Sequence, residues 1–122
     1  MAHSADGQDF VLRWTLHDAS EEPLTFLKLI RGKSYEDYKD AIKHFSCPAQ
    51  NIVFAAKNGD IALWTQGKLP LRKEMQGRFV QQGTSSGELW QGFIPQKDIP
   101  HEHNPAKNFV ASANQHSINP NV

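Results

Sequence analysis

The feature that most constrains the fold is the dipeptide Asn58-Gly59, which separates two β-prone runs. The first run, residues 51–57, is rich in β-branched and aromatic side chains, and the second covers residues 60–66. Asn-Gly is favoured at the centre of a type I′ turn because both central residues need a positive φ angle. The sequence therefore predicts an antiparallel hairpin at the centre of a sheet.

Two short helices are predicted before this hairpin. The first begins at Pro23, a residue suited to the first helical turn, and ends at Gly32. Ser34 is placed to cap the second, with Asp37 three residues on at the position of a capping-box acid. Apolar side chains recur at three- and four-residue spacing, so each helix has one face that can pack on the sheet.

Two further strands complete the predicted fold. Residues 9–15 alternate between apolar and polar side chains, and Phe109–Asn114 is a small, apolar run. We expect an α+β fold, in which a helix pair covers one face of an antiparallel sheet made of 9–15, 51–57, 60–66 and 109–114. The glycine-rich, basic stretch 66–88 is predicted to be an ordered loop, because loops of this length in compact domains are usually functional or anchored.

Composition excludes several classes of protein. The 13 basic and 13 acidic residues cancel, whereas a nucleic-acid-binding face needs a basic surplus. No apolar run approaches the roughly 18–20 residues of a membrane span. The single Cys47 rules out an internal disulfide, and we interpret it as a small buried side chain. One domain is expected at residues 9–118, after a start at 1–8 that is disordered or foreign to the natural protein and before a tail at 119–122.

Several short motifs follow one another in a recognisable order. They are the strand 9–15, the helix pair, Pro48-Ala49-Gln50-Asn51-Ile52-Val53-Phe54-Ala55, Asn58-Gly59-Asp60-Ile61, Gln66-Gly67-Lys68-Leu69-Pro70, Trp90-Gln91-Gly92-Phe93-Ile94-Pro95, Asn104-Pro105 and Phe109-Val110-Ala111-Ser112-Ala113-Asn114-Gln115. In this order the chain resembles the penicillin acylase (penicillin amidase) family of N-terminal-nucleophile hydrolases, over nearly all of its length after Gln8. The resemblance implies an internal segment of the large (β) subunit and part of an αββα sandwich.

The resemblance also implies a mechanism. In that family a serine freed by self-cleavage attacks an amide carbonyl, with its own α-amine as the base. That serine would lie upstream of Met1, and Ser4 does not match it, so the chain alone is expected to be inactive. The oxyanion is held by a backbone N–H and an Asn side chain, which falls on Asn114, while Gln50 matches a position near the acyl-binding pocket.

Asn114 also has a purely structural interpretation, in which its side chain closes a turn at a strand end. Without the family pattern this alternative is favoured; with the pattern, the oxyanion role is favoured. The oxyanion interpretation requires that Asn114 be held at the end of a β-paired segment.

No metal is predicted in this chain. The family often binds a structural calcium, but the nearest match here, at Gly77, offers only a backbone oxygen. His101-Glu102-His103 looks like a metal-binding pair, yet no third ligand lies nearby and a turn is the better interpretation.

Two functions remain open at this point. The chain is either a segment of an amide hydrolase or a stand-alone α+β binding module. The first makes the rest of the acylase polypeptide and a small amide its partners, leaves sheet edges free for self-association, and implies export beyond the cytoplasmic membrane.

Overall fold

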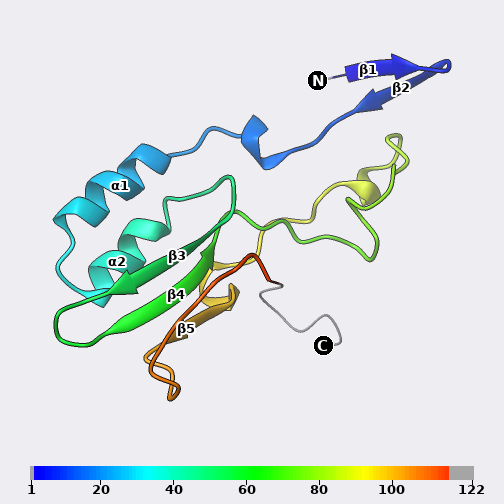
Figure 1. Ribbon diagram of the computed structural model, residues 1–122. Coiled ribbons are helices and arrows are strands. Elements are labelled where there is room, and N and C mark those ends of the chain that lie inside the picture. Colours follow the sequence, from blue (N-terminus) through cyan, green and yellow to red (C-terminus); the bar gives the residue numbers. More distant parts are fainter. Residues whose placement is uncertain (1, 116–122) are drawn as a thin grey trace.

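The computed structural model describes residues 2–115. Its strands are β1 (Ala2–Ala5), β2 (Gln8–Val11), β3 (Gln50–Ala55), β4 (Ile61–Gln66) and β5 (His101–His103). Its helices are α1 (Glu22–Arg31) and α2 (Tyr35–Ile42), with short 3-10 turns at Thr15–His17, Ser86–Glu88 and Gln96–Asp98. The helices and β3–β5 form a body, from which residues 2–14 and 71–90 extend as an arm (Figure 1).

The predicted hairpin is confirmed as the centre of the body. β3 and β4 are antiparallel, with Ile52 opposite Trp64, and β5 adds to the other edge of β4. The turn type differs from the prediction. Ala56 N–H donates to Asp60 O, and of the two turn residues only Gly59 has a positive φ, 96°, so the loop is a three-residue one.

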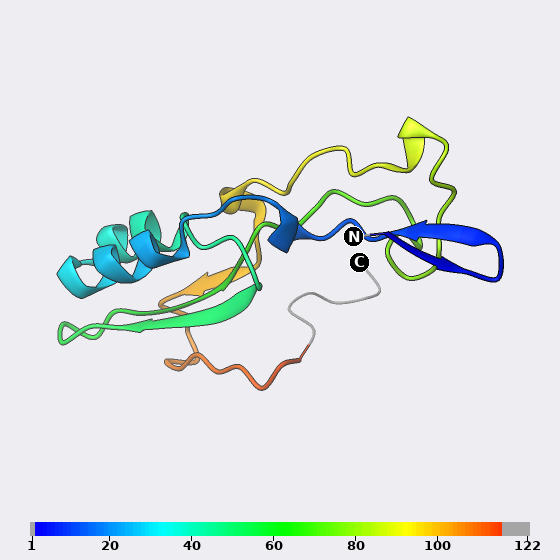
Figure 2. The same cartoon turned by 90° about the horizontal axis from the view of Figure 1, so that it is seen from above.

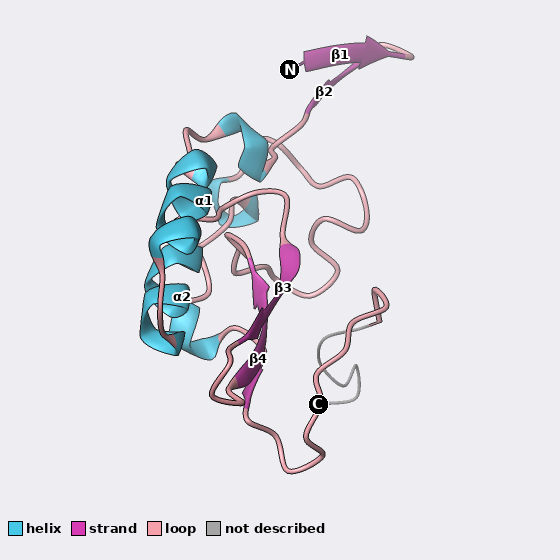
Figure 3. Cartoon of the chain, turned by 60° about the vertical axis from the view of Figure 1, so that its left-hand side comes forward, coloured by secondary structure: helices cyan, strands magenta, loops and turns pink. Residues whose placement is uncertain are grey.

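The helix pair is also confirmed. Ser34 Oγ accepts a hydrogen bond from Asp37 N at 3.1 Å, and Asp37 Oδ2 accepts one from Lys33 N at 2.9 Å, so the start of α2 is capped reciprocally. Both helices lie on the same face of the three-stranded sheet, as Figures 2 and 3 show from two directions.

The core lies between α2 and the hairpin. Tyr38 and Ile42 of α2 are buried against Ala62 and Trp64 of β4. Leu29, Tyr35, Ile52 and Phe54 pack around this cluster. A hydrogen bond of 2.7 Å from Tyr38 Oη to Ile52 O satisfies the one polar atom that the tyrosine brings into the core.

The predicted strand 9–15 is wrong in its partner and its extent. β2 pairs only with β1, with His3 opposite Phe10, in a separate two-stranded sheet within the arm. Residues 2–5, expected to be disordered or foreign, are therefore a strand. Alternation fixes the period of a strand but not its partner, and the nearest segment in sequence supplies it here.

The predicted strand Phe109–Asn114 is also wrong. The third strand of the sheet is β5, in a segment predicted to be a turn. Thr65 N–H donates to Pro100 O, and Asn104 N–H donates to Ile61 O, so the residues flanking β5 extend its pairing with β4. With that edge occupied, residues 109–115 run over the sheet face opposite the helices (Figures 2 and 3).

The prediction that residues 66–88 form an ordered loop is confirmed. Beyond β4, isolated bridges join Pro70 to Phe93 and Gln76 to Phe79, and no regular strand or α-helix falls between residues 71 and 90. Much of this loop belongs to the arm (Figure 2).

Candidate functional site

The sheet face opposite the helices is the candidate site, because the C-terminal segment that carries Asn114 lies over it (Figure 3). Strand alternation and register assign this open face Asn51, Val53, Ala55, Ile61, Leu63, Thr65 and Glu102. Val53 remains 55% exposed, so the segment covers the open face only in part.

Asn51 ties the C-terminal segment to this face. Its Nδ2 donates to Ser112 Oγ at 2.5 Å, and its Oδ1 accepts from Thr65 Oγ1 at 2.8 Å. The Oδ1 atom therefore fixes the Asn51 amide on the sheet, while the Nδ2 group holds Ser112. Asn51 and Ser112 both fall within the family motifs, but the order of the motifs does not predict this contact.

Asn114 lies two residues beyond that contact. It is exposed, with a φ of 57°, in a bend where Gln115 Oε1 accepts a hydrogen bond from Ala113 N. The preceding residues are not β-paired, so the arrangement that the oxyanion interpretation requires is not formed within residues 2–115. The role of Asn114 stays a prediction.

Gln50 begins β3 and is exposed. In the register it lies opposite Gln66, and alternation places it on the helix-facing side together with Ile52 and Phe54. The structure therefore does not bring Gln50 and Asn114 onto the same face of the sheet, and the substrate-binding role of Gln50 stays a prediction.

The family motifs instead contact one another in pairs. Asn104 Oδ1 accepts from Ile61 N at 2.9 Å, and Asn104 Nδ2 donates to Asp60 Oδ1 at 2.8 Å. The hydrogen bonds from Asn104 and Asn58 lower the pKa of the Asp60 carboxyl, since they favour its charged form, and His103 adds to the effect. The Asn104 side chain thus holds the Asn58-Gly59-Asp60 turn against the end of β5 through two hydrogen bonds.

Gly67 brings a second pair of motifs together. A Cβ at position 67 would lie 2.6 Å from Ala49 Cβ, so only glycine permits this approach. Lys68 N–H donates to Ser46 O at 2.7 Å on the same side. The following residues then pair with the Trp90–Pro95 motif, through Leu71 N–H to Gly92 O at 2.9 Å and Ile94 N–H to Leu69 O at 2.8 Å.

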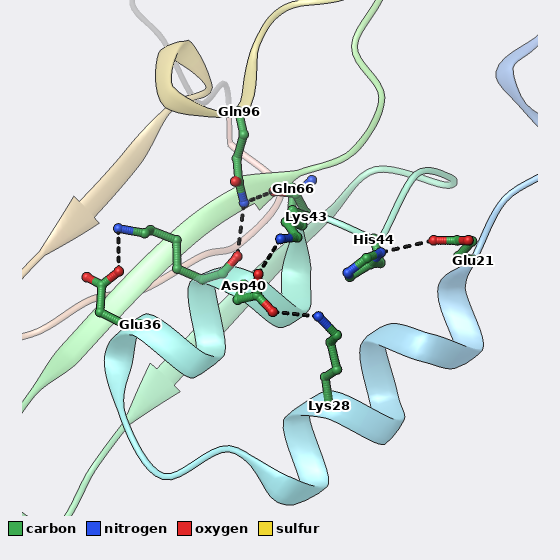
Figure 4. Close-up of polar contacts among 9 residues, drawn as sticks. Glu21, Lys28, Glu36, Asp40, Lys43, His44, Gln66 and Gln96 are labelled. Carbon is green, nitrogen blue, oxygen red and sulfur yellow. Dashed lines mark hydrogen bonds and ion pairs between the residues drawn. The ribbon is translucent and has the colours of Figure 1, made fainter.

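Two side-chain amides, one buried and one half-buried, continue this framework. Gln66 Nε2 donates to Phe45 O at 3.2 Å, and Gln96 Nε2 lies 3.2 Å from Lys39 O and 3.4 Å from Gln66 Oε1 (Figure 4). The two glutamines therefore join the end of β4, the end of α2 and the turn before β5. A buried amide that finds such partners avoids the cost of an unsatisfied polar group.

The charged groups nearby are ion pairs on the helix surface rather than a catalytic dyad. Asp40 contacts both Lys28 and Lys43, and these hydrogen bonds and charges lower the pKa of Asp40 to about 2 (Figure 4). Because the pairs are exposed, their contribution to stability is small.

The two histidines of β5 stack on aromatic rings. His101 lies parallel to Trp64 with ring centroids 4.0 Å apart, and His103 lies parallel to Tyr35 at 3.6 Å. Residues 2–115 contain no group of three or more potential metal ligands. The spacing of the two histidines was an indication of this arrangement, since residues at i and i+2 of a strand share one face. Here both imidazoles lie on the side of β5 where Trp64 and Tyr35 are found.

Cys47 is buried, as predicted, and lies 3.0 Å from Thr15 Oγ1.

Comparison with known families identifies the family to which these motifs belong. The family model described as penicillin amidase matches residues 2–122. The chain belongs to the penicillin amidase family. The matched range includes β1.

Relatives within the penicillin amidase family are much longer. The chain is 29% identical over 93 residues to an acyl-homoserine lactone acylase QuiP of Pseudomonas fluorescens, and 28% identical over 95 residues to that of Pseudomonas aeruginosa. The matches cover 76% and 78% of this chain and 11% of each relative. The chain thus spans about a tenth of the length of these relatives.

A solved structure gives the same fold. A thermostable penicillin G acylase from Alcaligenes faecalis superimposes with a TM-score of 0.70 at 22% identity, over 80% of this chain and 17% of that one. The α+β architecture with an antiparallel sheet is therefore that of a penicillin amidase segment. Within residues 2–115, no helix has the length and apolar character needed to cross a membrane.

Proposed function

We propose that this chain is part of a penicillin acylase-like amidohydrolase, to which it contributes sheet scaffold and the oxyanion donor Asn114. The acyl group is transferred to an N-terminal serine outside these 122 residues, so the chain alone is inactive. An amide N–H₂ group aimed at the carbonyl oxygen would stabilise the negative charge that develops in the transition state.

The observation that carries this proposal is the Asn51–Ser112 hydrogen bond of 2.5 Å. It holds the C-terminal segment on the open face, two residues before a side-chain amide that has no hydrogen-bond partner among residues 2–115. When a strand from the rest of the polypeptide pairs with residues 109–114, that amide becomes fixed without losing another interaction.

The substrate class follows from the same proposal. The relatives are named for acylated homoserine lactones and penicillin G, and we propose a small N-acyl amide for the whole enzyme, with Gln50 near the acyl group. No metal is proposed in this chain. Export beyond the cytoplasmic membrane is proposed from the family resemblance.

The test is reconstitution of hydrolysis. The segment is combined with the missing parts of the acylase, in one polypeptide or in trans, and release of aniline from an acylated aniline is measured. Asn114→Ala should lower kcat about 10²–10³-fold, the usual effect of removing one oxyanion donor, with little change in KM.

Asn108→Ala is the matched control, because Asn108 has a φ of 56° against 57° for Asn114 and so bears the same backbone penalty. Asn108→Ala should leave kcat unchanged. Equal activity of the two variants would remove Asn114 from the mechanism while leaving the family assignment intact.

A further inference from the structure

Asn58-Gly59 is the only asparagine–glycine pair in the 122-residue sequence. A peptide nitrogen that follows an asparagine can attack the side-chain carbonyl carbon of that asparagine, which closes a five-membered imide ring. Glycine favours this step because it has no side chain to hinder the nitrogen. Every other asparagine of the sequence is followed by a larger residue or by proline, whose nitrogen carries no hydrogen. The chemistry of deamidation therefore points to Asn58 first.

The turn leaves the path of this attack open. Lys57, Asn58 and Gly59 are exposed at the tip of the hairpin, at the end of the body far from the arm (Figure 1). A Cβ placed on Gly59 would meet nothing within 4 Å beyond its chain neighbours. An open hollow between the turn and Asn104 admits water to Asn58. Neither packing nor burial therefore prevents the reaction.

Hydrogen bonds within the turn oppose the same reaction. Asn58 Nδ2, which would leave as ammonia, donates to Asp60 Oδ2 at 3.1 Å, and Asn58 Oδ1 accepts from Asp60 N at 3.1 Å. Gly59 N–H, the nitrogen that would attack, donates to Ala56 O at 3.0 Å. The other oxygen of Asp60 accepts from Asn104 Nδ2 at 2.8 Å, which fixes the carboxylate in place. Ring closure therefore needs a local opening in which the Asn58 amide turns away from Asp60.

We propose that Asn58 is a site of spontaneous deamidation and that Asp60 slows the reaction by holding the Asn58 amide. Hydroxide takes the proton of the Gly59 nitrogen, which then attacks Asn58 Cγ. The new N–Cγ bond replaces the Cγ–Nδ2 bond, and Nδ2 leaves as ammonia after taking a proton from water. Water then opens the imide at either of its two carbonyls and leaves aspartate or isoaspartate at this position. One water is consumed and one ammonia is released, with no change of oxidation state.

The product would disturb the contact between the turn and β5. It places a carboxylate where the Nδ2 group now donates to Asp60, and two carboxylates at hydrogen-bond distance repel each other. In isoaspartate the main chain also runs through the former side chain, which adds a methylene to the three-residue loop. The hydrogen bond from Ile61 N to Asn104 Oδ1, 2.9 Å long, should weaken as a result. Deamidation would thus loosen the end of β5, independently of the proposed amide hydrolysis.

Site-resolved mass spectrometry tests the site. The 122-residue chain is incubated at mildly alkaline pH, and the tryptic peptides 58–68 and 108–122 are followed over time. Asn58 should deamidate several-fold faster than Asn108 and Asn114, and its rate should rise with pH because the attacking nitrogen must lose its proton. No conversion of Asn58, or conversion of Asn108 or Asn114 at an equal rate, would overturn the proposal.

Substitution of Asp60 tests its role. Asp60→Ala releases Asn58 Nδ2 and should raise the rate several-fold in the folded chain, whereas both chains should react equally fast when they are unfolded in urea. Glu102→Ala is the matched control, because Glu102 is an exposed carboxylate of β5 that pairs with Lys107, and it should leave the rate unchanged. Equal rates for the folded Asp60→Ala variant and the unaltered chain, or a difference that persists in urea, would overturn the role of Asp60.

A second variant guards against unfolding of the first. Asp60→Asn keeps the size of the side chain and one acceptor oxygen, but its hydrogen bond from Asn58 is no longer strengthened by a charge. Its rate should lie between those of the unaltered chain and Asp60→Ala. If circular dichroism shows that Asp60→Ala is unfolded, Asp60→Asn decides the question, and an unchanged rate would overturn the role of Asp60.

Amide hydrogen exchange tests the consequence for β5. Asn58→Asp mimics one product and should speed the exchange of the Ile61 amide, because its hydrogen bond to Asn104 is weakened. Asn58→Ser, which adds no charge beside Asp60, should change this exchange less. Equal exchange of the Ile61 amide in the two variants would overturn the predicted effect on β5.

Discussion

The body and the arm of this chain are stabilised by different kinds of contact. In the body, Ile42 and Ala62 are fully buried and Trp64 is 3% exposed, so burial of apolar surface supplies the stability. In the arm, Val11 and Val80 are 79% and 78% exposed. The body can therefore hold its structure from its own residues, whereas much of the apolar surface of the arm has no cover within residues 2–115.

Contacts at the base of the arm are cationic and aromatic. The guanidinium of Arg13 lies 4.9 Å from the Trp90 ring centre and bonds to both oxygens of Asp18 at 3.0 Å. The Lys68 ammonium lies 4.4 Å from the Phe93 ring centre. Contacts of this kind at exposed sites contribute about 0.5–1 kcal/mol each, so they orient the arm without forming a second core.

The sharpest test of the comparison is truncation of the core. Ile42→Ala removes a fully buried side chain and should lower the free energy of unfolding by about 2–5 kcal/mol, measured by urea denaturation. Ile30→Ala on exposed α1 should change it by less than about 0.5 kcal/mol. Similar effects of both variants would mean that the body is not held by its core.

A smaller effect is expected at the α2 cap. Ser34→Ala removes the oxygen that accepts the Asp37 amide and should destabilise the body by about 1 kcal/mol. Ser86→Ala, an exposed serine in the arm, is the control and should be neutral. A neutral Ser34→Ala in thermal denaturation would contradict the capping assignment.

The arm should respond locally instead. Trp90→Ala removes the ring that Arg13 and Arg72 cover and should change global stability by no more than about 1 kcal/mol. Limited proteolysis between residues 71 and 90 should nevertheless become faster, because local opening exposes this loop. Global unfolding as severe as that of Ile42→Ala would remove the distinction between body and arm.

The last prediction concerns pH and Glu22, which joins α1 to the turn after α2. Its hydrogen bonds from Ser20 and from the Cys47 and Ser46 amides lower the pKa of the carboxyl from 4.5 to about 2. A carboxylate with a lowered pKa stabilises the fold above its ordinary pKa, and this contribution is lost as the pH falls from about 4.5 to 2.

Glu22→Gln should therefore flatten the fall in stability between those pH values, as followed by circular dichroism. Glu36→Gln, on the exposed surface of α2, is the control. An unchanged acid profile for Glu22→Gln would show that Glu22 does not couple protonation to folding.

The parts of the fold that were predicted correctly depend on local chemistry. Asn58-Gly59 marked the hairpin, and Ser34 with Asp37 marked a helix start, because turns and caps involve residues close in sequence. The strands at 9–15 and 109–114 were placed wrongly because a sequence pattern indicates an extended segment but not the segment with which it pairs. β5 was missed because His-Glu-His lacks the apolar residues that usually mark a strand.

The site was less accessible to sequence reasoning than the fold. The motif order identified the penicillin amidase family, which the family model then matched. Which motif touches which could not be foreseen, because the Asn51–Ser112 and Asp60–Asn104 contacts join residues 61 and 44 positions apart. Within residues 2–115 no strand pairs with 109–114, so the oxyanion geometry that the family resemblance implies is not formed there.

β5 closes one side of the sheet. It is three residues long, its Glu102 forms an ion pair with Lys107 at 2.9 Å, and its two imidazoles are locked against Trp64 and Tyr35. A short, charged border of this kind discourages further pairing. The β5 edge therefore disfavours pairing with a further strand. Any strand that another chain adds to this sheet is expected to pair at the opposite edge, that of β3.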